Sequence, residues 1–179
     1  MGNNKILKLV TAALMSALTC VATLTLQIPN GIGGYIHPGD AFVILSGIIL
    51  GPFYGGLGAG IGSMLADLLS GYVQYALPTF CIKALAAILA YLLYRFIRIK
   101  LRFIVVIFSG ILAGAVVTIS YFLYDGFLYG SFASSALGIP GNLLQNLTGI
   151  VLSTLIYVLV YRIPQIKELI ENKKDYTNT

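Results

Sequence analysis

Charged residues are scarce in this chain of 179 residues, where Asp, Glu, Lys and Arg together make up 9%. A soluble domain usually carries about 25% charged residues. Hydrophobic residues make up 58% of the chain, and its mean hydropathy is +0.92. So few charges cannot cover a globule with a hydrated surface. The composition therefore argues against a soluble enzyme, a disordered chain and a nucleic-acid-binding protein, and it favours a lipid membrane as the surroundings.

Cysteine and histidine are also rare. The two cysteines, Cys20 and Cys81, lie within apolar runs, and there is a single histidine. This is too few for a zinc site, and a disulfide framework is not expected. The chain also lacks the G-x-x-x-x-G-K-[ST], H-E-x-x-H and G-x-S-x-G motifs. We therefore expect no catalytic residues, no metal and no cofactor, so the protein is not predicted to be an enzyme.

Six apolar runs dominate the chain, and a helix that crosses a membrane needs about 20 such residues. The first run could be a signal peptide, but it is longer than the apolar core of one, so we interpret it as a retained helix. The second run ends at Pro52 and covers about half of a ~30 Å hydrocarbon core. The prediction is an all-α membrane protein, a single six-helix transmembrane substrate-binding domain over residues 1–179 with a short helix 2. The expected helices are 7–28, 41–51, 53–72, 79–97, 103–124 and 140–161.

The basic residues indicate an orientation. With six crossings, all of the eleven Lys and Arg residues except Lys83 fall on the side of the two termini. The loops expected on the other side, 29–40, 72–78 and 125–139, contain none. The positive-inside rule then places the N and C termini in the cytoplasm, with residues 162–179 as a cytoplasmic tail. The chain is accordingly predicted to be a multi-pass protein of the cell membrane.

Polar side chains collect in the half of the bundle predicted to face outward. Polar groups inside a membrane are costly and normally face a cavity or a partner. We therefore predict an outward-facing cavity for a small polar solute. The candidate binding residues are Tyr35, His37, Asp40, Asp67, Lys83, Asn142, Gln145 and Asn146.

Simpler interpretations stay open for several of these residues. Asp67 and Lys83 could form an ion pair that only fastens two helices together. Asp40 could cap the short helix, because Asp before an apolar run is a common N-cap. His37 could be a hydrogen bonder of its loop. Tyrosines also gather at the outer helix ends, where they could form an interfacial belt or stack on a flat ring; they are Tyr35, Tyr72, Tyr75, Tyr124 and Tyr129.

The run GGYIHPGDAFVILSGIILGPFYGGLGAGIGSMLADLLSGY resembles the substrate-binding (S) components of energy-coupling factor (ECF) vitamin transporters. It is most similar to the riboflavin-type branch, which includes pyridoxine and hydroxymethylpyrimidine carriers. The H-x-G-D, G-P-x-x-G and A-D-L-x-S-G motifs carry the likeness, which is strongest over residues 31–85. The resemblance implies a subunit that binds a vitamin in an outer pocket covered by the first outer loop.

The resemblance also implies partners. S components dock on a transmembrane coupling subunit that works with two cytoplasmic ATPase subunits. The docking motif of the family, AxxxA in the first helix, is matched by Ala13 and Ala17. A pyridine- or pyrimidine-type ring is the first expectation for the solute, with pantothenate, riboflavin and cobalamin still open. The alternatives are a stand-alone secondary carrier or channel, a lipid-acting enzyme and a structural scaffold.

Overall fold

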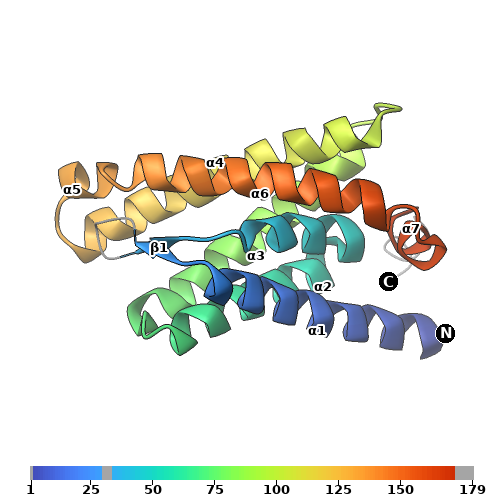
Figure 1. The fold of residues 1–179 in the computed structure, drawn as a ribbon, viewed down its shortest axis with the longest axis horizontal. Helices are drawn as coiled ribbons and strands as arrows, with labels where there is room; N and C mark the ends of the chain where they lie inside the picture. Colours follow the sequence, from blue (N-terminus) through green and yellow to red (C-terminus); the bar gives the residue numbers. More distant parts are fainter. Residues whose placement is uncertain (1, 30–33, 172–179) are drawn as a thin grey trace.

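The computed structural model describes residues 2–29 and 34–171, with side chains from residue 5 onward. Long helices lie side by side along one axis (Figure 1). Five helical stretches are long and apolar enough to cross a membrane, which confirms an all-α membrane protein. The long helices are α1 (Gly2–Thr25), α2 (Asp40–Leu69), α3 (Val73–Phe96), α4 (Arg102–Leu128) and α6 (Ile139–Val160). The short elements are β1 (Ile28–Pro29), β2 (Tyr35–Ile36), α5 (Phe132–Ala136) and α7 (Pro164–Glu171).

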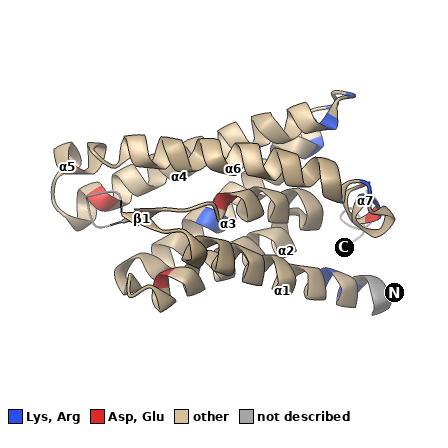
Figure 2. Ribbon diagram, viewed as in Figure 1, with Lys and Arg blue, Asp and Glu red and all other residues tan. Residues whose placement is uncertain are grey.

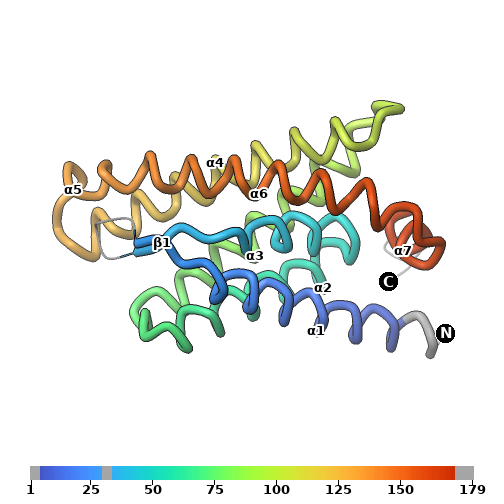
Figure 3. The backbone as a smooth tube through the Cα atoms, viewed as in Figure 1, coloured from blue at the N-terminus to red at the C-terminus, as the bar shows by residue number. Residues whose placement is uncertain are grey.

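Helix α2 consists of two segments that fold back on each other at Gly51 (Figure 3). Gly51 has φ 81° and ψ −175°, outside the helical region, and Pro52 follows it. Gly55 lies so close to the backbone of Ser46 that a Cβ at residue 55 would collide with the carbonyl oxygen of residue 46. The break that the sequence predicts at Pro52 is therefore present, and the short segment 40–50 precedes it.

Glycines of the second segment of α2 allow close helix packing on two sides. Gly58 and Gly62 face α1, and a Cβ at Gly58 would lie 3.1 Å from the carbonyl oxygen of Ala12. Gly56 and Gly60 face α3. Small residues let helix backbones approach closely in a membrane, as expected from the G-x-x-x-G spacing.

The first segment of α2 forms the centre of the bundle. Nearly every residue from 40 to 51 is buried, and α2 contacts α1, α3, α4 and α6. The apolar core surrounds Val43, Ile44, Leu45 and Ile48. The N-terminal residue of this segment, Asp40, is consequently held inside the bundle rather than at its surface.

Basic side chains gather at one end of the bundle (Figure 2). This end contains the start of α1, the link between α3 and α4, and α7. Helix α7 lies in the segment 162–179, which the sequence predicts to be a cytoplasmic tail. Its apolar side chains Ile166, Leu169 and Ile170 pack against the core. The last residues of the predicted tail, 172–179, lie outside the described residues.

Candidate functional site

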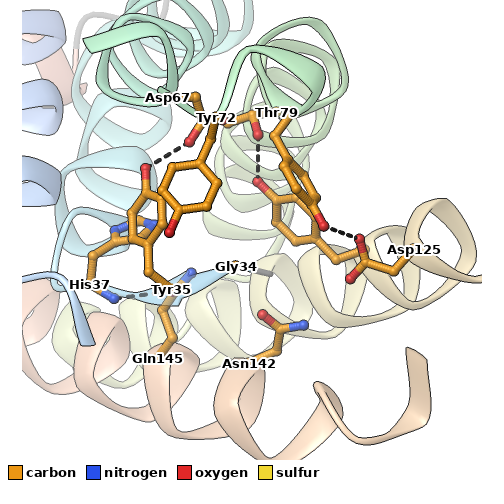
Figure 4. Close-up of a pocket in the computed structure, with 11 residues that line it drawn as sticks. Gly34, Tyr35, His37, Asp67, Tyr72, Thr79, Asp125, Asn142 and Gln145 are labelled. Carbon is orange, nitrogen blue, oxygen red and sulfur yellow. Dashed lines mark hydrogen bonds between the residues drawn. The ribbon is translucent and has the colours of Figure 1, made fainter. Parts of the chain in front are cut away.

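A cavity opens at the end of the bundle opposite the basic residues (Figure 4). The space in it and around its open mouth that no atom fills is about 440 Å³, open solvent included. Residues 34–39, which we call the cover segment, form one wall, and α2, α3, α4 and α6 form the others. The lining residues are Gly34, Tyr35, His37, Asp67, Tyr72, Tyr75, Thr79, Tyr121, Asp125, Asn142 and Gln145.

Two tyrosine–carboxylate pairs stand in the walls of this cavity. The hydroxyl of Tyr35 donates a hydrogen bond to Asp67 Oδ1 at 2.6 Å. The hydroxyl of Tyr75 donates to Asp125 Oδ1 at 2.7 Å. Both carboxylate side chains are buried. In the described part of the chain, Asp67 Oδ2 has no hydrogen-bond partner. One buried acceptor atom of the wall thus lacks a donor among the described residues.

Tyrosine rings line the cavity in a nearly continuous series. The ring centroids of Tyr35 and Tyr72 are 4.9 Å apart, and those of Tyr72 and Tyr75 are 6.4 Å apart. Tyr121 continues the series at 6.4 Å from Tyr75, and its hydroxyl forms a 2.8 Å hydrogen bond with Thr79. Such ring faces pack well against a flat aromatic solute.

A buried polar network lies beneath the cavity. Lys83 Nζ lies 2.5 Å from Asp40 Oδ1, and the side chain of Lys83 is fully buried. Gln145 Nε2 donates to Asp40 Oδ2 at 2.8 Å, and Gln145 Oε1 accepts from the backbone N–H of His37 at 3.2 Å. The network therefore joins α2, α3 and α6 to the cover segment.

This network corrects two interpretations of the sequence. The predicted Asp67–Lys83 pair is wrong, because the central segment of α2 brings Asp40 to Lys83 while Asp67 bonds to Tyr35. Asp40 is also not an N-cap. The cap position is Gly39, no side chain caps the helix there, and the Asp40 carboxylate binds Lys83 and Gln145 instead.

His37 holds the cover segment together. Its Nδ1 accepts a hydrogen bond from the backbone N–H of Gly39 at 3.1 Å and lies 3.3 Å from the hydroxyl of Thr23. Burial, and to a smaller extent the nearby charge of Lys83, lowers the pKa of His37 to about 4 against the opposing effect of Asp40. His37 is therefore neutral at physiological pH, as this acceptor role of Nδ1 requires.

Asn146 lies behind the cavity. Its Nδ2 donates to the carbonyl oxygen of Gly114 and to the hydroxyl of Thr118, both at 2.8 Å, and so ties α6 to α4. It also lines, with Asp40, a second and smaller hollow of about 220 Å³.

The eight residues predicted from the sequence thus fall into two layers. Tyr35, His37, Asp67, Asn142 and Gln145 line the cavity, whereas Asp40, Lys83 and Asn146 lie beneath or behind it. The prediction missed six lining residues, which are Gly34, Tyr72, Tyr75, Thr79, Tyr121 and Asp125. The sequence contains signals for all of these except Gly34. Tyr72 and Tyr75 belong to the tyrosines at the outer helix ends, and Thr79, Tyr121 and Asp125 lie on the polar faces of the predicted helices 79–97 and 103–124 or at their outer ends.

The predicted docking residues lie on the outer face of α1. Ala13 and Ala17 are exposed, whereas their neighbours Ala12 and Ser16 pack against the glycines of α2. Two overlapping pairs of small residues in α1 therefore have different surroundings. Ala12 and Ser16 pack against α2, whereas Ala13 and Ala17 are exposed on the outside of the bundle.

Comparison with known proteins decides the family. A family model described as "ECF-type riboflavin transporter, S component" matches residues 3–162. The chain belongs to this S-component family. The resemblance seen in the sequence is confirmed, and transport through a membrane is the activity of this family.

Two similar proteins show how much of the chain the similarity covers. An uncharacterized protein of Pyrococcus woesei is 30% identical over 150 residues, which cover 83% of this chain and 98% of the relative. A solved structure of the S component of a bacterial ECF transporter superposes with a TM-score of 0.64 at 22% identity. That match covers 93% of this chain and 99% of the solved one, so the S-component fold extends over nearly the whole chain.

Proposed function

We propose that this chain is the substrate-capturing subunit of an ECF-type importer, and that it binds a small water-soluble vitamin or vitamin precursor in the 440 Å³ cavity. The observation that carries this proposal is the polar, ring-lined cavity within an otherwise apolar bundle. A membrane protein places buried carboxylates and amides around a hollow when the hollow takes a polar solute. The family assignment supports the same function.

The charge distribution supports an outward-facing cavity. The basic residues lie at the end of the bundle opposite the cavity (Figure 2). The positive-inside rule assigns that basic end to the cytoplasm. In the proposed topology the two segments of α2 that meet at Gly51 count as separate crossings, which gives six crossings and puts both termini on the cytoplasmic side. The cavity is then filled from outside.

The lining of the cavity favours a small aromatic ring. The rings of Tyr35, Tyr72 and Tyr75 suit stacking on a flat solute. We favour a pyridoxine- or hydroxymethylpyrimidine-type ligand. Riboflavin, to which the matching family model points, is the next candidate, followed by pantothenate and cobalamin.

Energy for transport would come from partners. The sequence has no nucleotide-binding motif, so uptake would require a transmembrane coupling subunit and two cytoplasmic ATPases. The exposed face of Ala13 and Ala17 on α1 is the proposed contact with the coupling subunit. Small residues suit such a contact because they let another helix approach closely.

Two measurements test this proposal. Thermal unfolding of the purified chain with a panel of vitamins should show a concentration-dependent rise in melting temperature for one of them. Lipid vesicles that contain the chain alone should bind this vitamin without accumulating it. Accumulation should begin when the coupling subunit, the ATPases and ATP are added. Uptake by the chain alone would instead establish a stand-alone carrier, and a panel without any binder would remove the capture function.

A further inference from the structure

The cavity is lined by acidic groups that no lining cation balances. Asp67 and Asp125 stand in its walls, and no Lys or Arg is among the described residues that line it. Lys83, beneath the floor, is paired with Asp40. His37 is neutral above pH 4 because burial lowers its pKa. The wall therefore presents carboxylates without a compensating positive charge.

One of these carboxylates, which belongs to Asp67, has a buried acceptor without a donor among the described residues. Asp67 is 6% exposed, and its Oδ2 is buried without a hydrogen-bond partner among the described residues. A buried acceptor that lacks a donor is costly, and a donor on a bound ligand removes this cost. Oδ1 of the same carboxylate is already held by the Tyr35 hydroxyl (Figure 4).

The tyrosines of the wall also favour a positively charged ligand over a negatively charged one. The hydroxyls of Tyr35 and Tyr75 donate their protons to the two carboxylates. Their rings line the space between those carboxylates, and an aromatic face attracts a positive charge. A negatively charged group in this space would instead be close to two carboxylates. The cation Lys83, whose Nζ lies 5.5 Å from the centre of the Tyr121 ring, is already paired with Asp40.

We propose that the cavity selects a one-ring nitrogen heterocycle that carries a positive charge or several N–H and O–H donors, and that it excludes phosphorylated and carboxylate-bearing forms of the same compounds. This inference rests on the proposed vitamin-capture function and specifies its substrate class. In this assignment Asp67 Oδ2 accepts a ligand N–H, Asp125 accepts a second donor, and the tyrosine rings cover the heterocycle. Asp67 and Asp125 are thus specificity-determining residues.

The test uses two series of probes that differ in charge on one ring. The pyridine series is pyridoxamine, pyridoxine and pyridoxal phosphate, with an ammonium, a neutral hydroxymethyl and a phosphate group. The pyrimidine series is aminomethylpyrimidine, hydroxymethylpyrimidine and its phosphate. Binding to the purified full chain is measured by calorimetry at pH 7.5. In at least one series the ammonium or neutral member should bind, and the phosphate member should bind at least tenfold more weakly.

Variants of the wall then separate charge from shape. Asp67→Asn and Asp125→Asn should each weaken the ammonium probe by about tenfold to a hundredfold, because a hydrogen bond to a charged group is lost. The neutral probe should change far less, which also shows that the variant is folded. Glu168→Gln removes a negative charge from α7, away from the cavity. It should leave the order of the probe affinities unchanged.

Three results would overturn the inference. They are a phosphate member that binds as tightly as its ammonium partner, an Asp67→Asn variant with unchanged preference, and failure of both series to bind. Riboflavin, cobalamin and pantothenate are measured in the same assay. Binding of one of these alone would leave the capture function intact and remove only the proposed class, whereas failure of every vitamin would remove both.

Discussion

Lys83 on α3 and Asp40 on α2 form an ion pair, with 2.5 Å between Nζ and Oδ1, in the centre of a membrane bundle. Neither residue lines the cavity, yet Gln145 connects the pair to the cover segment through its two amide atoms. The pair thus supports the binding residues from beneath. Its role is one of positioning, whereas the sequence suggested direct contact with the solute.

Replacing Lys83 by Met should destabilise the fold strongly. Removal of one partner of a buried pair leaves an uncompensated charge and costs about 3–5 kcal/mol. The double variant Lys83→Met/Asp40→Asn should recover much of this loss, because both charges are then absent. Thermal unfolding in detergent measures both variants. If the double variant is no more stable than the single variant, the loss of stability comes from the packing of the two side chains and not from an uncompensated charge.

Replacing Gln145 by Leu should weaken ligand binding more than folding. The variant loses the hydrogen bonds to Asp40 and to the backbone of His37, so the cover segment is no longer tied to α6. We expect the ligand to dissociate about tenfold faster, equivalent to about 1.4 kcal/mol. Thr148→Val, on the exposed side of the same helix, is the control. Equal dissociation rates in the two variants would contradict this role of Gln145.

Acidification should destabilise the fold through His37. Its pKa is about 4 in the folded chain, below the ordinary value of 6.5, so the unfolded chain binds more protons between these values. Stability should therefore be independent of this group above pH 6.5 and fall as the pH drops from 6.5 toward 4. Melting temperatures measured across this window should fall less steeply in His37→Asn. An unchanged slope would assign the acid sensitivity to other groups.

Bulky residues on the exposed face of α1 should block assembly without affecting capture. Ala13→Trp and Ala17→Trp should reduce co-purification with the coupling subunit by at least tenfold, because the flat surface for a partner helix is lost. Vitamin binding by the isolated chain should be unchanged, because both residues lie outside the cavity. Val21→Leu, also exposed on α1, is the matched control. Normal assembly of both Trp variants would place the docking surface elsewhere.

The long helices and the break near Pro52 could be predicted because both depend on local sequence. Runs of apolar residues require helices in lipid, and the glycine before a proline supplies the positive φ of the reversal. The pairing of charges could not be predicted in this way. Asp40 and Asp67 belong to the same helix, and only the placement of the first segment of α2 inside the bundle decides which of them reaches Lys83.

The cavity wall was only partly predictable for a similar reason. Tyr121 and Asp125 share a helical face with Thr118 in the sequence, but this face alone does not reveal which polar residues bond to a neighbouring helix and which line a hollow. Thr118 bonds to Asn146, whereas Tyr121 and Asp125 line the cavity. The tyrosines were visible as a group, yet their use as hydrogen-bond donors to carboxylates depends on the tertiary structure.

The reversal at Gly51 determines how deep the cavity is. The segment from Asp40 to Leu50 has eleven residues and, at ~1.5 Å per residue, rises about 16 Å, roughly half of a ~30 Å hydrocarbon layer. The helix therefore starts near mid-depth, and the unfilled half above Asp40 is the volume that the tyrosines and the cover segment enclose. An additional helical turn between Asp40 and Gly51 would raise the carboxylate toward the mouth and fill the hollow with backbone. The cavity is present because the first segment of α2 begins below the outer surface of the bundle.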